Sequence, residues 1–183
     1  MSKRYIEIKE EKICGGVVVS RLFIRYPVSL GNNFLDAYYK AKAERFYEFM
    51  TQKVFIERER DFLSHIENGG RRCHFQTVEY KLDITVTGSC KNKVSVKTEA
   101  LGAENGTVCA YKIFSEIFDT ETGTLCRVRD ILKRRPREKY DGFYIKDGCL
   151  FLYASPSLQA KNLKISELSG LLSPIASFDI VNE

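Results

Sequence analysis

The chain has 183 residues, of which 44% are hydrophobic and 29% charged, and its formal net charge is +5. This length can bury a core that needs no stapling, and the composition is that of an ordinary globular domain. The small charge excess does not favour nucleic acid as a partner, and no apolar run approaches the roughly 20 residues of a membrane-spanning helix.

The N-terminus shows no targeting signal. Met1 and the residues after it lack the apolar stretch of a signal peptide, which is about 7–15 residues long. We therefore expect a cytoplasmic protein, or an extracytoplasmic one if the sequence is a piece of a longer exported chain.

Cysteine usage argues against a metal or redox site. The six cysteines are widely spaced and form no CxxC pair, so neither a zinc knuckle nor a thioredoxin-type motif is supported. Because each lies in or beside an apolar run, we expect buried free thiols, with disulfides as the alternative. His65 and His74 stand in no thiolate-activating signature, so we expect no catalytic cysteine, and no metal or other cofactor is predicted.

The first 70 residues indicate two strands followed by a long helix. Alternating β-branched and aromatic residues over 5–29 predict strands joined by a turn at Gly15 and Gly16, with Pro27 ending the second. An apolar series of period 3.6 predicts a helix over 33–67, capped by Asn32 or Asn33. The series shifts phase near residue 54, which predicts a bend there, and the charges over 57–61 indicate a solvated face.

From residue 73 the period changes to two. Strands are predicted over 73–86, 94–98 and 107–119, with a turn over 88–92 and a loop over 101–106. Within that loop Asn105-Gly106 is the strongest hairpin signal of the chain.

The last third predicts shorter elements. These are a turn over 119–123, a helical turn over 128–132, a basic run over 133–139, a hairpin of 143–145 with 150–153 around Asp147-Gly148, a helix over 166–172 and a strand over 176–181.

Together these patterns predict an α+β fold in which a long helix packs on a twisted antiparallel sheet. We expect one domain over 1–183. Residues 1–70 supply the N-terminal strands and the long helix, and residues 71–183 supply an antiparallel meander, the closing hairpin and a short helix.

Several motifs also carry a family resemblance over about residues 17–172. They are Tyr26-Pro27, Asn32-Asn33-Phe34-Leu35, Val94-Ser95-Val96, Leu101-Gly102-Ala103-Glu104-Asn105-Gly106, Phe118-Asp119 with Thr122-Gly123, Val128-Arg129-Asp130-Ile131-Leu132, the closing hairpin and Pro156. The chain resembles the extracytoplasmic domain of RsiV-type lysozyme-sensing anti-sigma factors, which also occurs beside peptidoglycan deacetylase domains. Turn and packing motifs of this kind identify a fold better than a function.

The resemblance implies a domain that binds a protein or a cell-wall-related ligand. Glu104 stands where the family has a histidine, and the sensors' cytoplasmic and transmembrane segments have no counterpart here. The signalling role is therefore not carried over. We expect a non-enzymatic binding or sensing module, with Gly102, Ala103, Glu104, Asn105 and Gly106 as its candidate binding residues.

Two other functional interpretations of the sequence have less support. A small-substrate hydrolase would use Asp119 and Glu121, but acidic residues in Thr-Gly turns usually bind local backbone N–H groups. The basic run over 133–139 would suit phosphate or an acidic partner, but such runs are usually solvated loops. Asp130 is expected to act structurally at the start of its helical turn.

Overall fold

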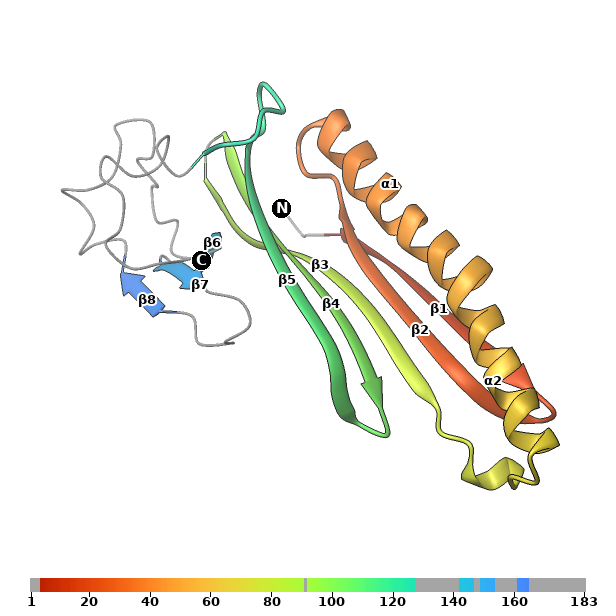
Figure 1. Ribbon diagram of the computed structural model, residues 1–183. Helices are drawn as coiled ribbons and strands as arrows, with labels where there is room; N and C mark the ends of the chain where they lie inside the picture. The colour runs from red at the N-terminus through yellow and green to blue at the C-terminus, as the bar shows by residue number, and fades with distance from the viewer. Residues whose placement is uncertain (1–3, 91, 128–141, 147–148, 154–160, 165–183) are drawn as a thin grey trace. The chain divides into compact units, whose positions relative to one another are not determined.

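The computed structural model describes residues 4–90, 92–127, 142–146, 149–153 and 161–164. A continuous helical run of 35 residues consists of α1 (Asn33–Phe49), a π-helical turn η1 (Met50–Val54) and α2 (Phe55–Glu67). A short 3-10 turn, η2 (Arg72–His74), follows it. The strands, shown in Figure 1, are β1 (Arg4–Cys14), β2 (Val17–Val28), β3 (Val78–Cys90), β4 (Lys93–Glu104), β5 (Thr107–Asp119), β6 (Gly142–Lys146), β7 (Cys149–Tyr153) and β8 (Lys161–Lys164).

The main sheet is mixed, so the prediction of an antiparallel sheet is wrong. Its strand order is β1-β2-β3-β4-β5, and β6, β7 and β8 form a second sheet. β1 pairs antiparallel with β2, whereas β2 pairs parallel with β3, from Ser20 opposite Val78 to Arg25 opposite Asp83. The helical run connects β2 to β3, and a crossover of this kind returns the chain beside its starting strand in the same direction. The fold is α+β, but strands dominate it.

The chain divides into two compact units. The first unit contains Met1–Val28, Ala37–Ile84 and Glu99–Lys112, and the second contains Ser29–Asp36, Thr85–Thr98 and Ile113–Glu183. The division cuts through β3, β4 and β5 rather than falling at residue 70. A single domain over 1–183 stays a prediction.

The long helix begins and ends where the sequence predicts. Asn32 is the cap, because its Oδ1 accepts the backbone N–H groups of Phe34 at 2.8 Å and Leu35 at 3.3 Å. The chain leaves the helix through Asn68 and through Gly69, whose φ is +80°. The phase shift of the apolar series falls at the π-helical turn, whose extra residue per turn re-aims the buried face.

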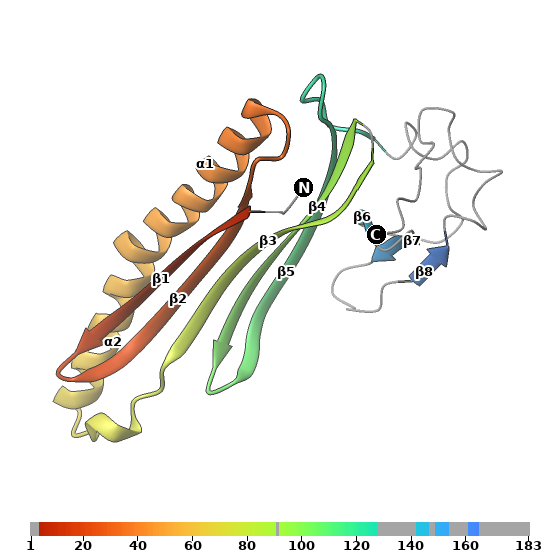
Figure 2. The same ribbon diagram turned by 180° about the vertical axis from the view of Figure 1, so that it is seen from behind.

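An apolar layer holds the first unit together. Leu22 and Ile24 of β2 and Tyr39 of α1 are almost fully buried. α2 contacts both β1 and β2, and the helix lies along one face of these strands (Figures 1 and 2). Burying one large aliphatic side chain contributes about 1.5–3 kcal/mol, so this layer is the main source of stability in the unit.

Polar contacts attach the second sheet within the second unit. The backbone N–H of Ile145 on β6 donates to the Ser95 hydroxyl of β4 at 3.0 Å, and the Ser115 hydroxyl of β5 donates to the Phe143 carbonyl. A Cβ on Gly88 would lie 3.0 Å from the Ile145 carbonyl oxygen, so β6 approaches the β3 backbone closely. The predicted closing hairpin is confirmed by the antiparallel pairing of β6 with β7.

The Thr-Gly turn after β5 is also confirmed. The N–H of Gly123 donates to the Asp119 carbonyl at 2.8 Å. The side-chain amide of Asn32 donates to the Thr120 carbonyl at 2.9 Å, and the Thr120 N–H donates to the Asn92 carbonyl at 2.6 Å. The helix cap therefore also fixes this turn.

Several boundaries differ from the prediction. β2 continues through Pro27, because its pairing with β3 ends at Arg25 and the missing N–H costs no ladder bond there. β4 runs through residues 99–104, which were expected to be partly loop, and β3 begins only at Val78. Cys14, Cys73, Cys109 and Cys126 are free thiols, and of these four only Cys14 is buried, while Cys73 and Cys109 are exposed.

The elements predicted over 128–132, 133–139, 166–172 and 176–181 and the Asp147-Gly148 turn lie outside the described residues. Among the described helices, none has an apolar stretch long enough to cross a membrane.

Candidate binding site at the β4–β5 hairpin

The predicted binding residues form the tip of a tight hairpin. Asn105 and Gly106 have φ values of +49° and +77°, which is the geometry of a two-residue turn of the primed type. Both residues are exposed, whereas Gly102 and Ala103 are buried in β4 and Glu104 is half-buried at its end. The hairpin prediction is confirmed, and Glu104, Asn105 and Gly106 are the members accessible to a ligand.

The site also contains Tyr80 of β3, which packs beside Gly102 and which the sequence does not reveal. A Cβ built on Gly102 would lie 3.8 Å from the Tyr80 ring, 3.6 Å from the Cys109 sulfur and 3.5 Å from the Ala110 Cβ. The Cys109 thiol donates to the Gly102 carbonyl at 3.2 Å. Tyr80 therefore packs close to the β4 and β5 backbones, on the strand face that carries Cys109.

The phenol of Tyr80 is neutral at physiological pH. Burial raises its pKa above the ordinary value, the nearby Arg58 guanidinium opposes this rise, and Cys109, Glu104 and Asp61 add to it. A neutral phenol both donates and accepts a hydrogen bond. Tyr80 and Glu104 are close enough to interact electrostatically, so the site contains one neutral and one acidic group.

Arg58 of α2 is the second residue that the sequence did not reveal. Its Nη2 donates to the Gln76 carbonyl at 2.6 Å, its Nη1 lies 3.5 Å from an Asp61 carboxylate oxygen, and its guanidinium lies 4.7 Å from the Phe75 ring centroid. Its buried Nε has no hydrogen-bond partner among the described residues. The solvated face predicted over 57–61 is therefore wrong at Arg58, because aromatic packing draws the guanidinium inward.

Asp119 and Glu121, the two acids considered for hydrolysis, are part of a turn that the Asp119 carboxylate stabilises. One carboxylate oxygen of Asp119 accepts the backbone N–H groups of Glu121 and Thr122, each at 3.0 Å. The other accepts the Asn92 side-chain amide at 3.0 Å and lies 3.8 Å from the Lys93 ammonium. The backbone hydrogen bonds from Thr122 and Glu121 lower the pKa of Asp119, and the bond from Thr122 has the largest effect. Such geometry is typical of a turn-forming carboxylate.

Beyond the turn, the first residues of β5 lie at an edge of the main sheet where no further strand pairs with them among the described residues. It is the last strand in the order, and the side chains of residues 107–112 are all exposed, with Val108 at 54%. The opposite edge strand, β1, has a charge at more than half of its positions and a register shift between Lys12 and Ile13. Charges and bulges are the usual protection of sheet edges against pairing, and residues 107–111 have neither a charge nor any shift recorded among the described pairings.

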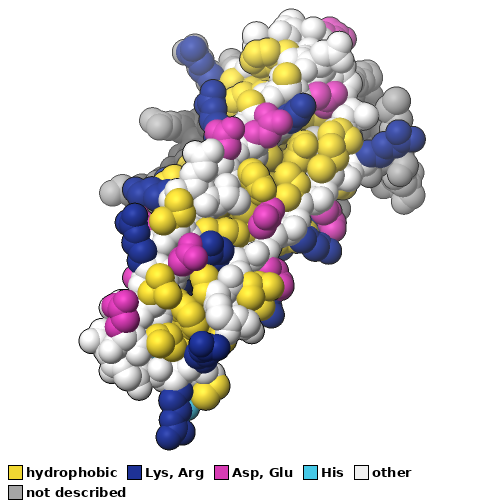
Figure 3. Space-filling view, turned by 90° about the vertical axis from the view of Figure 1, so that its right-hand side faces the viewer, with side chains coloured by type: hydrophobic (Ala, Val, Ile, Leu, Met, Phe, Trp, Pro, Cys, Tyr) yellow, Lys and Arg dark blue, Asp and Glu magenta, His cyan; other side chains and the backbone are white. Residues whose placement is uncertain are grey.

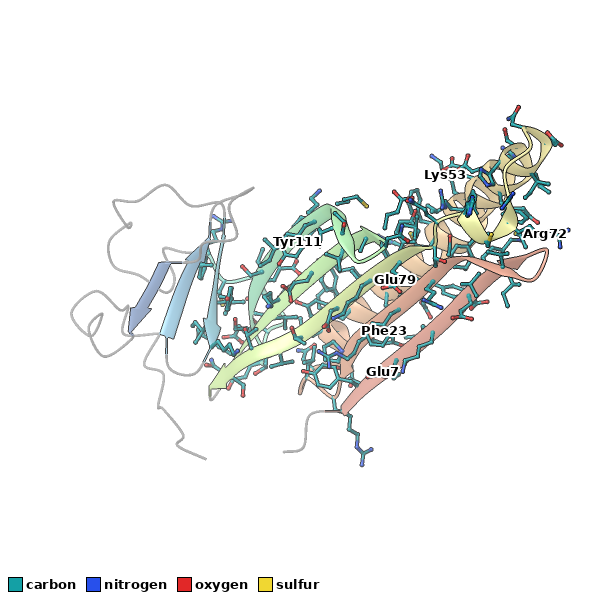
Figure 4. All side chains as sticks on the ribbon, turned by 90° about the horizontal axis from the view of Figure 1, so that it is seen from below. Glu7, Phe23, Lys53, Arg72, Glu79 and Tyr111 are labelled. Atoms are coloured by element: carbon teal, nitrogen blue, oxygen red, sulfur yellow. The ribbon has the colours of Figure 1, made fainter. Side chains whose placement is uncertain are left out.

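The open face of β1, β2 and β3 is polar, but its charges already pair with each other. Arg21 lies 2.9 Å from Glu11 and 3.2 Å from Glu79, and Arg25 binds both carboxylate oxygens of Asp83. Figure 4 labels Glu7, Phe23 and Glu79 on this face and Tyr111 on β5. A face that neutralises itself offers little to a charged ligand, so the β4–β5 hairpin is the better candidate.

Among the described residues, no group of His, Cys, Asp and Glu side chains is placed to hold a metal ion.

Two solved structures are similar to this chain in fold. A DUF3298 family protein from Pseudomonas aeruginosa matches with a TM-score of 0.58 at 12% identity, over 95% of each chain. A DUF3298 family member from Bacteroides fragilis matches with a TM-score of 0.64 at 12% identity, over 94% of each chain. No family model and no curated protein matches the sequence. The chain thus shares the DUF3298 fold, and identity this low shows the fold alone.

Proposed function

We propose that this chain, with its DUF3298 fold, is a non-enzymatic binding module that takes an extended segment of a partner protein along β5. The observation that carries the proposal is the exposed, uncharged run over residues 107–110 on the last strand of the main sheet. An extended peptide adds a strand to such an edge, where main-chain hydrogen bonds provide affinity and alternate side chains provide specificity.

The hairpin geometry identifies which backbone groups are available. In a two-residue hairpin, the residues flanking the turn, here Glu104 and Thr107, pair with each other. The next residue, Val108, therefore directs its N–H and C=O away from β4. These two groups are the first that an added strand would engage.

Polar groups near the edge supply selectivity. The half-buried carboxylate of Glu104 and the anchored guanidinium of Arg58 are each close enough to the neutral phenol of Tyr80 to affect its pKa. A hydrogen-bond acceptor on a side chain of the partner would bind Arg58 or Tyr80. A carboxylate on that side chain would be repelled by the carboxylate of Glu104.

The sequence resemblance to RsiV-type lysozyme sensors supports a protein ligand, since binding is the role of that family. A cell-wall fragment is the alternative within the same resemblance. The sheet edge favours protein, because a glycan has no backbone amide ladder to match the exposed N–H and C=O groups of β5.

The test is titration of the whole chain with three probes: lysozyme, soluble peptidoglycan fragments and a displayed library of extended peptides. We expect enrichment of peptides with alternating β-forming residues. Val108→Pro removes the outward N–H without breaking a β4–β5 bond, and it should weaken peptide binding at least tenfold.

Val108→Ala is the matched control, since it keeps the N–H and trims only the side chain, and it should bind within about threefold of the wild type. Thermal melting of both variants checks that they fold. Absence of any protein or peptide binding, or binding that Val108→Pro leaves unchanged, would count against the proposal. Binding of peptidoglycan fragments alone would assign the module to cell-wall recognition instead.

A further inference from the structure

The carboxylate of Glu104 is an uncompensated charge at the β4–β5 hairpin. Glu104 is half-buried at the end of β4, and among the described residues no ion pair or hydrogen bond reaches its carboxylate. In contrast, Glu11, Glu79 and Asp83 of the same sheet each lie within 3.2 Å of an arginine nitrogen. A partly buried charge that has lost water and gained no counter-ion is stabilised when a ligand supplies a cation.

The side chain of Glu104 extends over the sheet face that carries Tyr80 and Cys109. A Cβ on Gly102, two positions before Glu104, would lie 3.8 Å from the Tyr80 ring and 3.6 Å from the Cys109 sulfur. Residues two positions apart on a strand point to the same face, so Glu104 shares this face. Its effect on the pKa of Tyr80 agrees with this placement.

The short side chain of Thr107 separates Glu104 from the open side of β5. These two residues flank the turn and pair with each other, so their side chains point to the same face. A strand added outside β5 would lie about 10 Å from β4, since neighbouring strands are about 4.8 Å apart. The long stem of a lysine or arginine on that strand can cross Thr107 and bring its charge to the carboxylate.

The basic residues near the hairpin do not neutralise Glu104. Arg58 directs one nitrogen to an Asp61 carboxylate oxygen at 3.5 Å and another to the Gln76 carbonyl at 2.6 Å. The first basic residue of β5 is Lys112, five positions after the start of the strand and about 16 Å along an extended chain. Glu104 therefore gives the beginning of the β5 edge a negative charge.

The side of the molecule that carries the long helix has charges of both signs. Lys40 lies 3.7 Å from Glu44, and Lys12 lies 2.7 Å from Glu59. Figure 3, which views this side, shows basic and acidic side chains interspersed. A basic segment of a partner would be attracted and repelled in turn there, whereas at the start of β5 it meets the carboxylate of Glu104.

We propose that the segment bound along β5 is basic, with a lysine or arginine that crosses Thr107 to form an ion pair with Glu104. This inference rests on the proposed strand addition and names the chemistry of the partner. Main-chain hydrogen bonds can hold any extended peptide, so the ion pair decides which segment is bound and in which register. An ion pair at a partly exposed site raises affinity by a factor of about five.

Selection of a displayed library of extended peptides against the whole chain tests the proposal. Peptides selected by the wild type should carry lysine or arginine at one fixed position, and those selected by Glu104→Lys should carry aspartate or glutamate there. Glu104→Gln keeps the shape without the charge and should select neither sign. Glu121→Gln is the matched control, because Glu121 is an exposed acid beyond the other end of β5, and it should select the same basic peptides as the wild type.

Titration of one selected peptide measures the ion pair directly. Replacing its basic residue with glutamine should weaken binding to the wild type about fivefold, but should weaken binding to Glu104→Gln by less than about twofold. Raising the salt concentration to about 0.5 M should reduce the fivefold difference, because the pair is partly exposed. Thermal melting of each variant checks that it folds.

The outcomes separate this inference from the binding proposal on which it rests. Peptides that Val108→Pro weakens but that show no basic preference would overturn the ion pair and leave strand addition in place. A basic preference that persists in Glu104→Gln would also overturn the pairing with Glu104. Absence of any peptide binding would overturn both proposals.

Discussion

Both compact units of this protein bury apolar side chains, Val96 and Ile117 among them in the second, but the contacts that join their outer elements differ. In the first unit an amphipathic helix covers β1 and β2 with apolar side chains such as Leu22, Ile24 and Tyr39. In the second unit side-chain oxygens and amides bind backbone groups, as Ser95 binds β6 and Asn32 binds the Thr-Gly turn. Apolar burial is non-directional and scales with area, whereas each polar contact depends on one geometry. The two units should therefore respond differently to single substitutions.

The largest effect is expected in the apolar layer. Ile24 is fully buried in β2, so Ile24→Ala should lower the free energy of unfolding by about 2–5 kcal/mol through lost transfer energy and a cavity. Urea denaturation measures it, with the exposed Ile13→Ala as control, which should cost no more than about 0.5 kcal/mol. A loss below about 1 kcal/mol at Ile24 would show that the helix does not seal this face.

A smaller effect is expected where β6 attaches. Ser95→Ala leaves the buried N–H of Ile145 without its acceptor, and an unsatisfied buried donor costs about 1–3 kcal/mol. Amide hydrogen exchange should show faster exchange at Ile145. Ser89→Ala, at an exposed serine one strand away, should change neither measurement, and slow exchange at Ile145 in Ser95→Ala would contradict the role of the hydroxyl.

The turn carboxylate should give a pH-dependent effect. The pKa of Asp119 is lowered from its ordinary value of 3.8, first by the backbone hydrogen bond from Thr122. A lowered folded-state pKa means that the stabilisation is complete above pH 4 and is lost as pH falls through the folded value. Asp119→Asn should therefore cost about 1 kcal/mol at pH 7, and this difference should shrink below pH 4.

Urea titrations at a series of pH values give this dependence. Glu121→Gln is the control, since Glu121 is exposed and contributes only its backbone N–H to the turn. A difference between wild type and Asp119→Asn that stays constant down to pH 2 would mean that the charge of Asp119 has no part in the turn.

The smallest effect is expected on the open polar face. Arg21 binds Glu11 and Glu79, but all three side chains are about half exposed, and water screens such pairs. Arg21→Ala should shift the melting temperature by no more than about 1 °C, and added salt should remove the shift. A larger, salt-independent loss would show that this face is held together as strongly as the apolar one.

Local periodicity was sufficient for most elements of the first unit. The 3.6-residue series predicts the helix from 33 to 67 within one residue, and the left-handed turns at Gly15-Gly16 and Asn105-Gly106 follow from residues that tolerate positive φ. The candidate site was only partly accessible in this way. The sequence predicts its hairpin tip but not Tyr80 and Arg58, because nothing in the local pattern of either residue shows that they lie close to each other in the fold.

The sequence by itself determined the helix, the strand-forming segments, the tight turns and a helix cap at Asn32 or Asn33. Each depends on residues within one or two turns of the chain. Only the tertiary structure decided that the phase shift is a π-helical turn, that β2 and β3 pair in parallel, that Ser95 binds the backbone N–H of Ile145, and that Asp119 binds the side-chain amide of Asn92. The strand pairing and these two hydrogen bonds join segments tens of residues apart, and partners at that distance are fixed by packing and chain crossover rather than by local preference.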